Sequence, residues 1–462
     1  MSDSATIPTK PEIRIPSSAA GVSNCADVLF PLIRERRTLF NRDKELVEVV
    51  RRGGDYEFSI VNAAAAVSRF EDYAQFVKLV RAEDGDWQSV PVTLKEQDAK
   101  LLLETRHRKA ELDTIQGIMQ FPLLVERDHQ LVLLQNGYDR QSGLFITNPA
   151  PVAEVSLATA VQSLRALLDD YSFQSDGDFS RALASFLTPA LKFGGFINGP
   201  IPIDVGEADE SQAGKSFRQT LVPALYNHRM TILTVSRGGV GSLDERLYEA
   251  LIRGKSFIQI DNVRGKLDSQ VLESLVTAHG EFSSRAAFIR NTPVDCSKAM
   301  LFVSSNGFMT TPDLANRSSI IRLRRQPGHI WRTYAGLDLR QHIQAHLADY
   351  QGAVMAVIRQ WHAQGKPRTE ETRHSFQDWC QILDWIVQNV LMEAPLLDGH
   401  ESAKLRCTNP HLSFIRQVAL AVEATGRLET PFSASNIVEL CEQQDIQIPG
   451  LRATNTKMLR PN

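Results

Sequence analysis

Cysteine is scarce in this chain of 462 residues, and its distribution argues against a disulfide-stapled or zinc-stabilised fold. The cysteines are scattered, at Cys25, Cys296, Cys380, Cys407 and Cys441. No two of them form a Cys-x-x-Cys pair, the usual element of a zinc site or a redox motif. Unpaired cysteines are typical of reducing compartments, so we expect a cytoplasmic protein.

The sequence also lacks long apolar runs and a strong excess of charge. No apolar stretch approaches about 18 residues, the length that indicates a membrane helix, and no signal-peptide pattern opens the chain. We therefore expect a soluble chain with no membrane partner. The formal net charge of −3 neither requires nor excludes nucleic acid. A bound polyanion would need basic residues concentrated in a pore or groove.

Changes in composition and periodicity divide the chain into segments. Residues 1–25 are rich in Ser, Pro, Thr and Ala, which predicts a disordered tail. Residues 26–150 have a mixed α/β pattern and would form a collar or docking domain. Over 155–330 apolar strands alternate with amphipathic helices, which predicts a parallel sheet covered by helices. Residues 331–406 are largely helical, and 407–462 resemble the start of a winged helix that stops before the wing.

The segment 206–216, Gly-Glu-Ala-Asp-Glu-Ser-Gln-Ala-Gly-Lys-Ser, is the most informative part of the sequence. It follows an apolar run at 196–205 and precedes a stretch with helical spacing. A phosphate-binding loop has this layout, because its backbone N–H groups and the N-terminus of the next helix face the phosphates. The residues expected to contact phosphate are Glu210, Ser211, Gln212, Ala213, Gly214, Lys215 and Ser216.

Two of these side chains have specific expected roles. Lys215 would reach the terminal phosphates, and the Ser216 hydroxyl would hold Mg²⁺. Asp209 departs from the pattern Gly-x-x-x-x-Gly-Lys-Ser, which has glycine at that position. A surface turn before a helix can also contain Gly-Lys-Ser, so the downstream motifs decide between the two interpretations.

The second motif is an apolar strand that ends in Asp261 and Asn262. Ligands bind at the carboxyl ends of the strands in such sheets, so Asp261 would face Lys215 and support Mg²⁺. A buried strand that ends in an Asp turn is the structural alternative. Many related ATPases carry a glutamate at the position of Asn262, to polarise the attacking water. An amide cannot act as a base but can orient a water.

Two further motifs lie downstream. The apolar strand at 300–304 leads to Asn306, which could hydrogen-bond the γ-phosphate, although an Asn-Gly turn needs no function. Arg317 follows a short predicted helix and precedes a strand, where oligomeric ATPases place an arginine that reaches the neighbour's γ-phosphate. An arginine at a helix end on the surface is the alternative.

Arginines also flank a predicted hairpin at 284–294. In ring helicases a hairpin at this place in the order grips the DNA backbone inside the pore, so Arg285 and Arg290 are candidate DNA-binding residues. An ordinary hairpin with exposed arginines would show the same pattern.

Taken in order, these motifs resemble a known family. The order is a phosphate loop, Ile-Asp-Asn-Val, an arginine-bearing hairpin, Ser-x-Asn, and Asp-Leu-Ala-x-Arg with Ile-x-Leu. It resembles the AAA+ ATPase domain of phage, plasmid and genomic-island replication helicases, close to superfamily 3 and to primase–helicase proteins. Upstream, Gly-Tyr-Asp-x-x-x-Gly-Leu at 137–144 resembles a segment that precedes the ATPase in those proteins.

The resemblance implies a P-loop ATPase that assembles as a homohexameric ring and moves along single-stranded DNA during replication of a mobile genetic element. Its cofactors would be ATP and Mg²⁺. Lys215 and Ser216 would bind phosphate and Mg²⁺, Asp261 would support Mg²⁺, Asn306 would sense the γ-phosphate, and Arg317 would act in the neighbouring subunit. Residues 1–150 show no carboxylate cluster for primase chemistry, so a primase or initiator protein would be a separate partner.

Other functions remain open from the sequence. With Asn262 in place of a glutamate, the chain could be an ATP-binding switch or assembly scaffold with little hydrolysis. An initiator that melts origin duplex would keep the ring but would need sequence-specific duplex binding. The balance of acidic and basic residues over 407–462 argues against that alternative, because duplex binding depends on concentrated positive charge.

Overall fold

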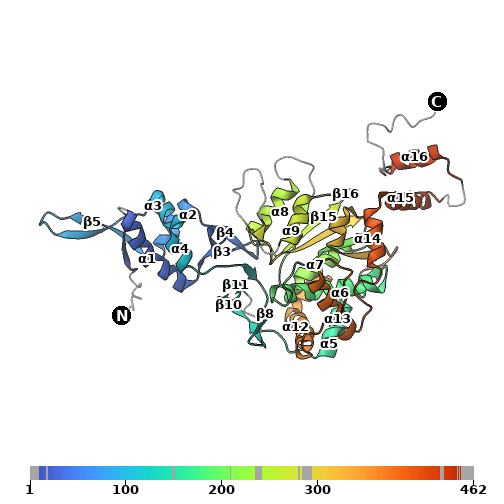
Figure 1. The fold of residues 1–462 in the computed structure, drawn as a ribbon, viewed down its shortest axis with the longest axis horizontal. Coiled ribbons are helices and arrows are strands. Elements are labelled where there is room, and N and C mark those ends of the chain that lie inside the picture. The colour runs from blue at the N-terminus through green and yellow to red at the C-terminus, as the bar shows by residue number, and fades with distance from the viewer. Residues whose placement is uncertain are drawn as a thin grey trace.

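The computed structural model describes residues 10–16, 19–147, 151–208, 210–234, 242–278, 281–282, 294–426, 431–444, 446 and 448. In Figure 1 an N-terminal lobe, drawn in blue and cyan, lies at one end of a larger body built around a sheet. The last two helices, drawn in red, lie at the other end. In this described part of the chain, no helix is long and apolar enough to cross a membrane.

The N-terminal lobe combines helices with a small sheet in the order β1-β5-β6. Its strands are β1 (Glu12–Arg14), β5 (Gln75–Arg81) and β6 (Trp87–Pro91), and its helices are α1 (Ala19–Arg36), α2 (Ala63–Glu71), α3 (Glu96–Glu104) and α4 (Arg106–Glu111). The lobe has its own hydrophobic cluster, in which Phe30 and Phe70 pack edge to face at 6.1 Å.

The described part of the expected disordered tail, residues 10–16 and 19–25, is structured, and residues 1–9, 17 and 18 lie outside the described residues. Ile13 of β1 is buried and pairs with Phe76 of β5, and α1 begins at Ala19. The physical reason is the spacing of apolar residues in α1. Cys25, Ala26 and Leu29 share one helix face and are buried against the rest of the lobe.

Short antiparallel ladders connect the lobe to the body. They comprise β2 (Leu39–Arg42), β3 (Glu45–Arg52) and β4 (Asp55–Ile60), then β8 (Leu123–Arg127) with β9 (Gln130–Leu134), and β10 (Asn136–Asp139) with β11 (Leu144–Thr147), which pairs in parallel with β7 (Gly117–Met119). Lys255 of the body lies 3.0 Å from Asp55 and 3.1 Å from Glu57 of β4. The backbone N–H of Phe58 also donates to the Arg253 carbonyl at 3.0 Å. These contacts attach β4 directly to the body.

The body contains a six-stranded sheet in the order β12-β21-β13-β19-β15-β14. Its strands are β12 (Ser172–Phe173), β13 (Ile203–Ala208), β14 (Thr231–Thr234), β15 (Phe257–Val263), β19 (Met300–Asn306) and β21 (Ser318–Arg324). All pair in parallel except β12, which runs antiparallel to β21. The expected mixed α/β core with a parallel sheet is therefore confirmed. Smaller pairs are formed by β16 (Lys266–Leu267) with β20 (Met309–Thr310), and by β17 (Glu281–Phe282) with β18 (Val294–Asp295).

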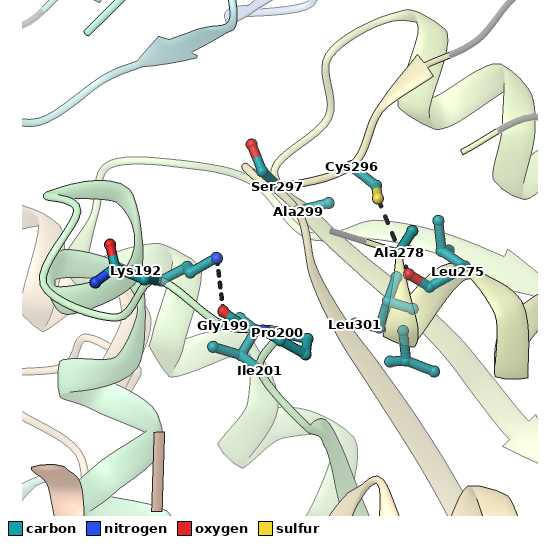
Figure 2. A pocket seen from close by; sticks show the side chains of 12 residues that line it. Lys192, Gly199, Pro200, Ile201, Leu275, Ala278, Cys296, Ser297, Ala299 and Leu301 are labelled. Carbon is teal, nitrogen blue, oxygen red and sulfur yellow. Dashed lines mark hydrogen bonds between the residues drawn. The ribbon is translucent and has the colours of Figure 1, made fainter. Parts of the chain in front are cut away.

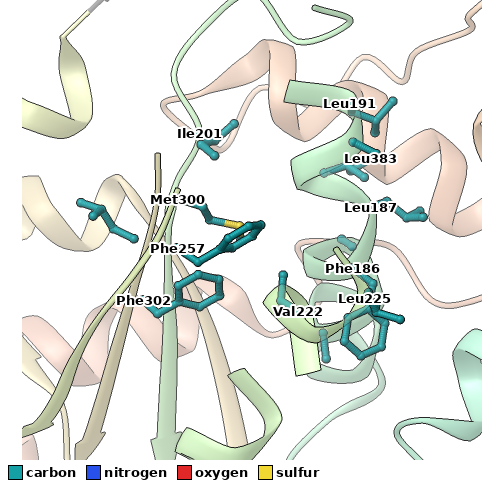
Figure 3. Close-up of a cluster of buried hydrophobic side chains, with 14 of the residues drawn as sticks. Phe186, Leu187, Leu191, Ile201, Val222, Leu225, Phe257, Met300, Phe302 and Leu383 are labelled. Carbon is teal, nitrogen blue, oxygen red and sulfur yellow. The ribbon is translucent and has the colours of Figure 1, made fainter. Parts of the chain in front are cut away.

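Helices cover the sheet and continue beyond it. They are α5 (Leu157–Ala166), α6 (Asp176–Phe193), α7 (Lys215–Leu225), α8 (Leu243–Ile252), α9 (Gln270–Thr277), α10 (Pro312–Asn316), α11 (Leu339–Ala345), α12 (Leu347–Ala363), α13 (Gln377–Asn389), α14 (His400–Thr408), α15 (Pro410–Ala424) and α16 (Ala434–Gln443). Figure 3 shows Phe257 and Phe302 of the sheet beside Val222 of α7 and Phe186 of α6. Burying each such aromatic side chain contributes about 1.5–3 kcal/mol.

The helices after the sheet share this core. Val357 and Trp361 of α12 and Leu383 of α13 belong to the same buried cluster as the sheet residues. Arg181 of α6 is fully buried and ties the layers together, donating to the carbonyls of Ile320 at 2.8 Å and Leu396 at 2.7 Å. Because one core spans both segments, residues 339–407 fold together with the sheet.

Acid is expected to destabilise the fold through buried histidines. Burial lowers the pKa of His374 to about 4, from the ordinary histidine value of 6.5. Above a pH of about 6.5, the His374 side chain is neutral in both the folded and the unfolded protein. As the pH falls from about 6.5 towards 4, this side chain takes up a proton in the unfolded protein but not in the folded protein. Stability should therefore fall over this window, by about 3 kcal/mol for this group.

Urea unfolding between pH 7 and pH 4 tests this expectation. His374→Gln should flatten the dependence of the unfolding free energy on pH, whatever its effect at pH 7. The matched control is His129→Gln, because the side chain of His129 is 98% exposed. An unchanged pH dependence in His374→Gln would contradict the assignment.

Candidate functional site

The structure places the Gly-Lys-Ser motif between a strand and a helix. β13 extends to Ala208, and α7 begins at Lys215 with Gly214 as its N-cap. Gly214 has φ +81°, a left-handed conformation that favours glycine, and Gln212 has φ +66°. The strand is shorter than the apolar run at 196–205 and lies further along the chain, because it begins at Ile203 and continues through Gly206 to Ala208. Asp209, the departure from the motif, lies outside the described residues.

Lys215 and Asn306 meet at the carboxyl edge of the sheet. Asn306 ends β19 and pairs in register with Ala208, the last residue of β13. The Lys215 ammonium donates to Asn306 Oδ1 at 2.6 Å. Burial lowers the pKa of the Lys215 amine, while the carboxylates of Asp261 and Glu207 raise it. The structure thus brings together Lys215, which is predicted to bind the terminal phosphates, and Asn306, which is predicted to contact the γ-phosphate.

Ser216 and Asp261 form a second contact at the same edge. The Ser216 hydroxyl donates to Asp261 Oδ1 at 2.8 Å. The Ser304 hydroxyl donates to the same carboxylate oxygen, and it accepts from the backbone N–H of Asn262 at 2.9 Å. The register of β15 against β19 shifts between Ile260 and Val263, and Asn262 adopts φ +53° within this irregularity. Asn262 is exposed at its side chain.

Ser304 is the serine of the Ser-x-Asn motif, and the sequence assigned it no role of its own. It lies two positions before Asn306, and alternate residues of a strand share one face of the sheet. That spacing was the available signal, because a serine on the same face as a candidate sensor would reach the same edge. Ser304 now links the strand of Asn306 to Asp261 and Asn262.

The oxygen atoms of Ser216 and Asp261 fit a magnesium ion that is shared with a phosphate ligand. Mg²⁺ is usually held by one or two carboxylates or hydroxyls, with waters and substrate phosphates completing the octahedron. Among the described residues, no group of three or more His, Cys, Asp or Glu could hold a metal by itself. The donor set therefore suits a metal that arrives with a phosphorylated ligand.

A buried polar network holds the predicted phosphate loop against the sheet. Arg218 of α7 forms a fully buried ion pair with Asp204 of β13. Gln219 donates to Asp204 Oδ1 at 2.9 Å and to the Val303 carbonyl at 3.0 Å, and it accepts from Gln259 at 2.7 Å. Helix α7 is thereby bonded to β13, β19 and β15, the three strands that supply the site.

Arg317 lies at the opposite edge of the sheet. It caps α10 directly before β21, whose first residue, Ser318, pairs with Ile203 at the amino end of β13. Its guanidinium forms an ion pair with Asp313 at 2.8 Å and donates to the Glu273 carbonyl at 2.9 Å. At about 3.3 Å of rise per residue, the length of β21 separates Arg317 from its own phosphate loop by roughly 15–20 Å.

The remaining predicted residues have different outcomes. Arg285 and Arg290, the candidate DNA contacts, lie outside the described residues. Glu210 forms an exposed ion pair with Arg325 at 2.6 Å, and Ser211 is exposed. Ala213 is buried in the main core.

Glu207 is a buried carboxylate beside the phosphate loop that sequence reasoning did not single out. It precedes the last residue of β13 and is 1% exposed. The Arg406 guanidinium of α14 donates to it, and Arg416 of α15 lies 3.6 Å away. Burial raises the pKa of the Glu207 carboxyl, and the two arginines oppose that rise. These contacts connect the C-terminal helices to the strand that leads into the loop.

A cavity lies away from this site. It has a volume of about 110 Å³ and sits near the amino ends of β13 and β19, where its lining includes Ile201 and Ala299. Figure 2 shows Lys192 donating to the Gly199 carbonyl, at 2.7 Å, beside the cavity. Burial lowers the pKa of Lys192 to about 8. The cavity and the phosphate loop are therefore separate features at opposite edges of the sheet.

Comparisons with known proteins give no family assignment. No family model and no curated protein matches the sequence. Among solved structures, one described as "SCCmec type IV Cch - active helicase" is 11% identical, with a TM-score of 0.34, covering 88% of this chain and 91% of its own. The C-terminal region of NrS-1 is 12% identical, with a TM-score of 0.32, covering 68% of this chain and 72% of its own. TM-scores this low do not establish a common fold, so the functional conclusion rests on the residues of the site.

The buried contact of Glu207 generates a prediction about stability. Arg406→Ala should destabilise the fold by roughly 3 kcal/mol, because it leaves a buried carboxylate without its nearest cation. Arg253→Ala is the matched control, since it removes an exposed helical ion pair with Glu249 that is worth less than about 1 kcal/mol. Urea unfolding at neutral pH measures both. Equal, small effects of the two substitutions would contradict the importance of the Glu207 contact.

Proposed function

We propose that this chain is an ATPase with a P-loop AAA+ core, and that it acts as a DNA helicase or translocase in replication of a mobile genetic element. The observation that carries the proposal is the pair of hydrogen bonds at the carboxyl edge of the sheet. Lys215 is joined to Asn306 and Ser216 to Asp261. This is the arrangement that phosphate binding and metal support require.

Each residue has a role that follows from its position. The N-terminus of α7 and the Lys215 ammonium would neutralise the phosphates of ATP. Ser216 and Asp261 would hold Mg²⁺, which bridges phosphate oxygens and neutralises the charge that develops on them. Asn306 lies within hydrogen-bonding distance of Lys215 and would contact the terminal phosphate. Asn262 would orient the attacking water without removing its proton.

A ring oligomer is supported by the position of Arg317. This arginine lies at the amino edge of the sheet, whereas the phosphate loop lies at the carboxyl edge. In one chain the two are too far apart to contact the same phosphate, so Arg317 would complete the site of a neighbouring copy. We propose a hexamer in which Arg285 and Arg290 line the pore and contact single-stranded DNA. A separate primase or initiator protein would be its partner.

An ATP-dependent switch or assembly scaffold is the second candidate function. Asn262 favours it, because an amide occupies the position from which a carboxylate would activate water. Its backbone is held by Ser304 in a left-handed conformation that asparagine tolerates. Such a protein would bind MgATP normally and hydrolyse it slowly, with or without DNA.

Steady-state ATP hydrolysis with and without single-stranded DNA tests the proposal. DNA should stimulate the wild type, and Lys215→Ala and Arg317→Ala should each lose roughly 10³-fold or more. A mixture of the two variants should recover part of the activity, because Lys215→Ala subunits supply Arg317 to the intact site of the other variant. Arg253→Ala, an exposed surface change, is the control.

Two outcomes would contradict the proposal. Tight MgATP binding with negligible turnover, unaffected by DNA, would favour the switch or scaffold. If mixing restores no activity although both variants assemble with each other, Arg317 does not act across a subunit boundary.

A further inference from the structure

Two aromatic side chains pack directly on the phosphate loop. Trp331 follows β21, the last strand of the six-stranded sheet in the chain, and Tyr171 precedes β12, the first. The two side chains therefore come from segments that are far apart in the sequence. A β-carbon on Gly214 would lie 2.6 Å from Trp331 Cη2 and 3.0 Å from Tyr171 Cε1. The rings also contact each other, with centroids 5.2 Å apart. Both aromatic side chains therefore pack against the loop at Gly214.

The two rings differ in how they are buried. Trp331 is 40% exposed, whereas Trp361 and Trp379 lie in the core at 1% and 2%. Trp331 therefore keeps part of its aromatic side chain open to solvent beside the loop, whose residues Glu210 and Ser211 are also exposed. Trp331 is held in place by Tyr171 and by His329, whose ring packs edge to face against it at 5.1 Å.

Tyr171 supplies a second, independent observation. It is 7% exposed, and within the described part of the chain its hydroxyl has no hydrogen-bond partner. Buried hydroxyls are nearly always paired, so an unpaired one calls for an explanation. Cε1 is bonded to the carbon that carries the hydroxyl, so its closeness to Gly214 places the hydroxyl beside the phosphate loop. A ligand bound at the loop would provide the missing partner.

We infer that Trp331 and Tyr171 form the part of the site that binds the base and sugar of a nucleotide. The base stacks on the exposed face of Trp331, and the Tyr171 hydroxyl hydrogen-bonds a polar atom of the ribose or base. This inference rests on the proposed function, because the phosphates of the same ligand occupy the loop of Lys215. It adds which side chains contact the base and sugar of that nucleotide.

Stacking also predicts how selective the site is. Every nucleobase has an aromatic face, so a stacking platform tolerates different bases and favours those with larger rings. ATP and GTP should therefore bind with similar affinity, and both should bind more tightly than CTP or UTP. Inorganic tripolyphosphate has no base and should gain nothing from Trp331.

Isothermal titration with MgATP and with magnesium tripolyphosphate separates the two halves of the site. Trp331→Ala should weaken ATP binding by roughly 10- to 100-fold and leave tripolyphosphate binding unchanged. Trp331→Phe should retain most of the ATP affinity, because it keeps an aromatic face. The matched control is Trp87→Ala, which removes a 66% exposed tryptophan from β6 in the N-terminal lobe. Unfolding curves check that all variants fold.

Several results would overturn the inference. If Trp331→Ala weakens both ligands equally, the ring only supports the loop. If it leaves ATP binding unchanged, or tightens both ligands, the ring covers the loop and does not bind the base. A different result would contradict the proposed function itself. In that case the wild type binds neither ligand, or Lys215→Ala binds both ligands as tightly as the wild type does.

Discussion

The parallel register of β13, β15 and β19 is the constraint on which the candidate site depends. It brings Ala208, Asp261 and Asn306 to one edge of the sheet, so residues about 100 positions apart meet within hydrogen-bonding distance. The register is itself held by the buried network of Asp204 and Gln219 under α7. Polar groups buried this way are costly when unpaired, so the loop is fixed to the strands that supply its partners.

The two edges of the sheet hold different parts of the proposed site. Lys215, Ser216, Asp261 and Asn306 lie together at the carboxyl edge, whereas Arg317 is held at the amino edge by Asp313 and Glu273. The C-terminal helices are tied to the carboxyl edge through Glu207, and the N-terminal lobe is tied to the body through Lys255. Glu207 therefore links the strand before the loop directly to the C-terminal helices, whereas the N-terminal contact lies at Lys255, before the amino end of β15.

The sequence predicted those parts of the structure that depend on local pattern. Alternating apolar strands and helices indicated the parallel sheet, and Gly-Lys-Ser between a strand and a helix indicated where a loop would lie. Glu207 was missed because a single acid at the end of an apolar strand looks like part of the following loop. Its burial depends on Arg406, which lies nearly 200 positions away. Tyr171 and Trp331 were also missed, since packing between distant segments places them at the loop and no short motif contains them. Ser304 belongs to the Ser-x-Asn motif, but its contact with Asp261 depends on the packing of β19 beside β15.

The start of the chain also depends on contacts between segments that are distant in sequence. Residues 1–25 have the composition of a disordered tail, yet β1 pairs with β5 and α1 packs Cys25 into the lobe. A strand of three residues gains its stability from the partner strand rather than from its own sequence. Composition therefore did not predict β1 or the start of α1, because tertiary contacts stabilise both elements.

Binding of ATP with and without Mg²⁺, compared between the wild type and Ser216→Ala, tests the central claim most directly. The account predicts that Mg²⁺ tightens ATP binding to the wild type and that Ser216→Ala abolishes this dependence, because Ser216 and Asp261 hold the metal together. Binding that is independent of Mg²⁺ in both proteins, or the absence of ATP binding, would contradict a magnesium–nucleotide site at this edge of the sheet.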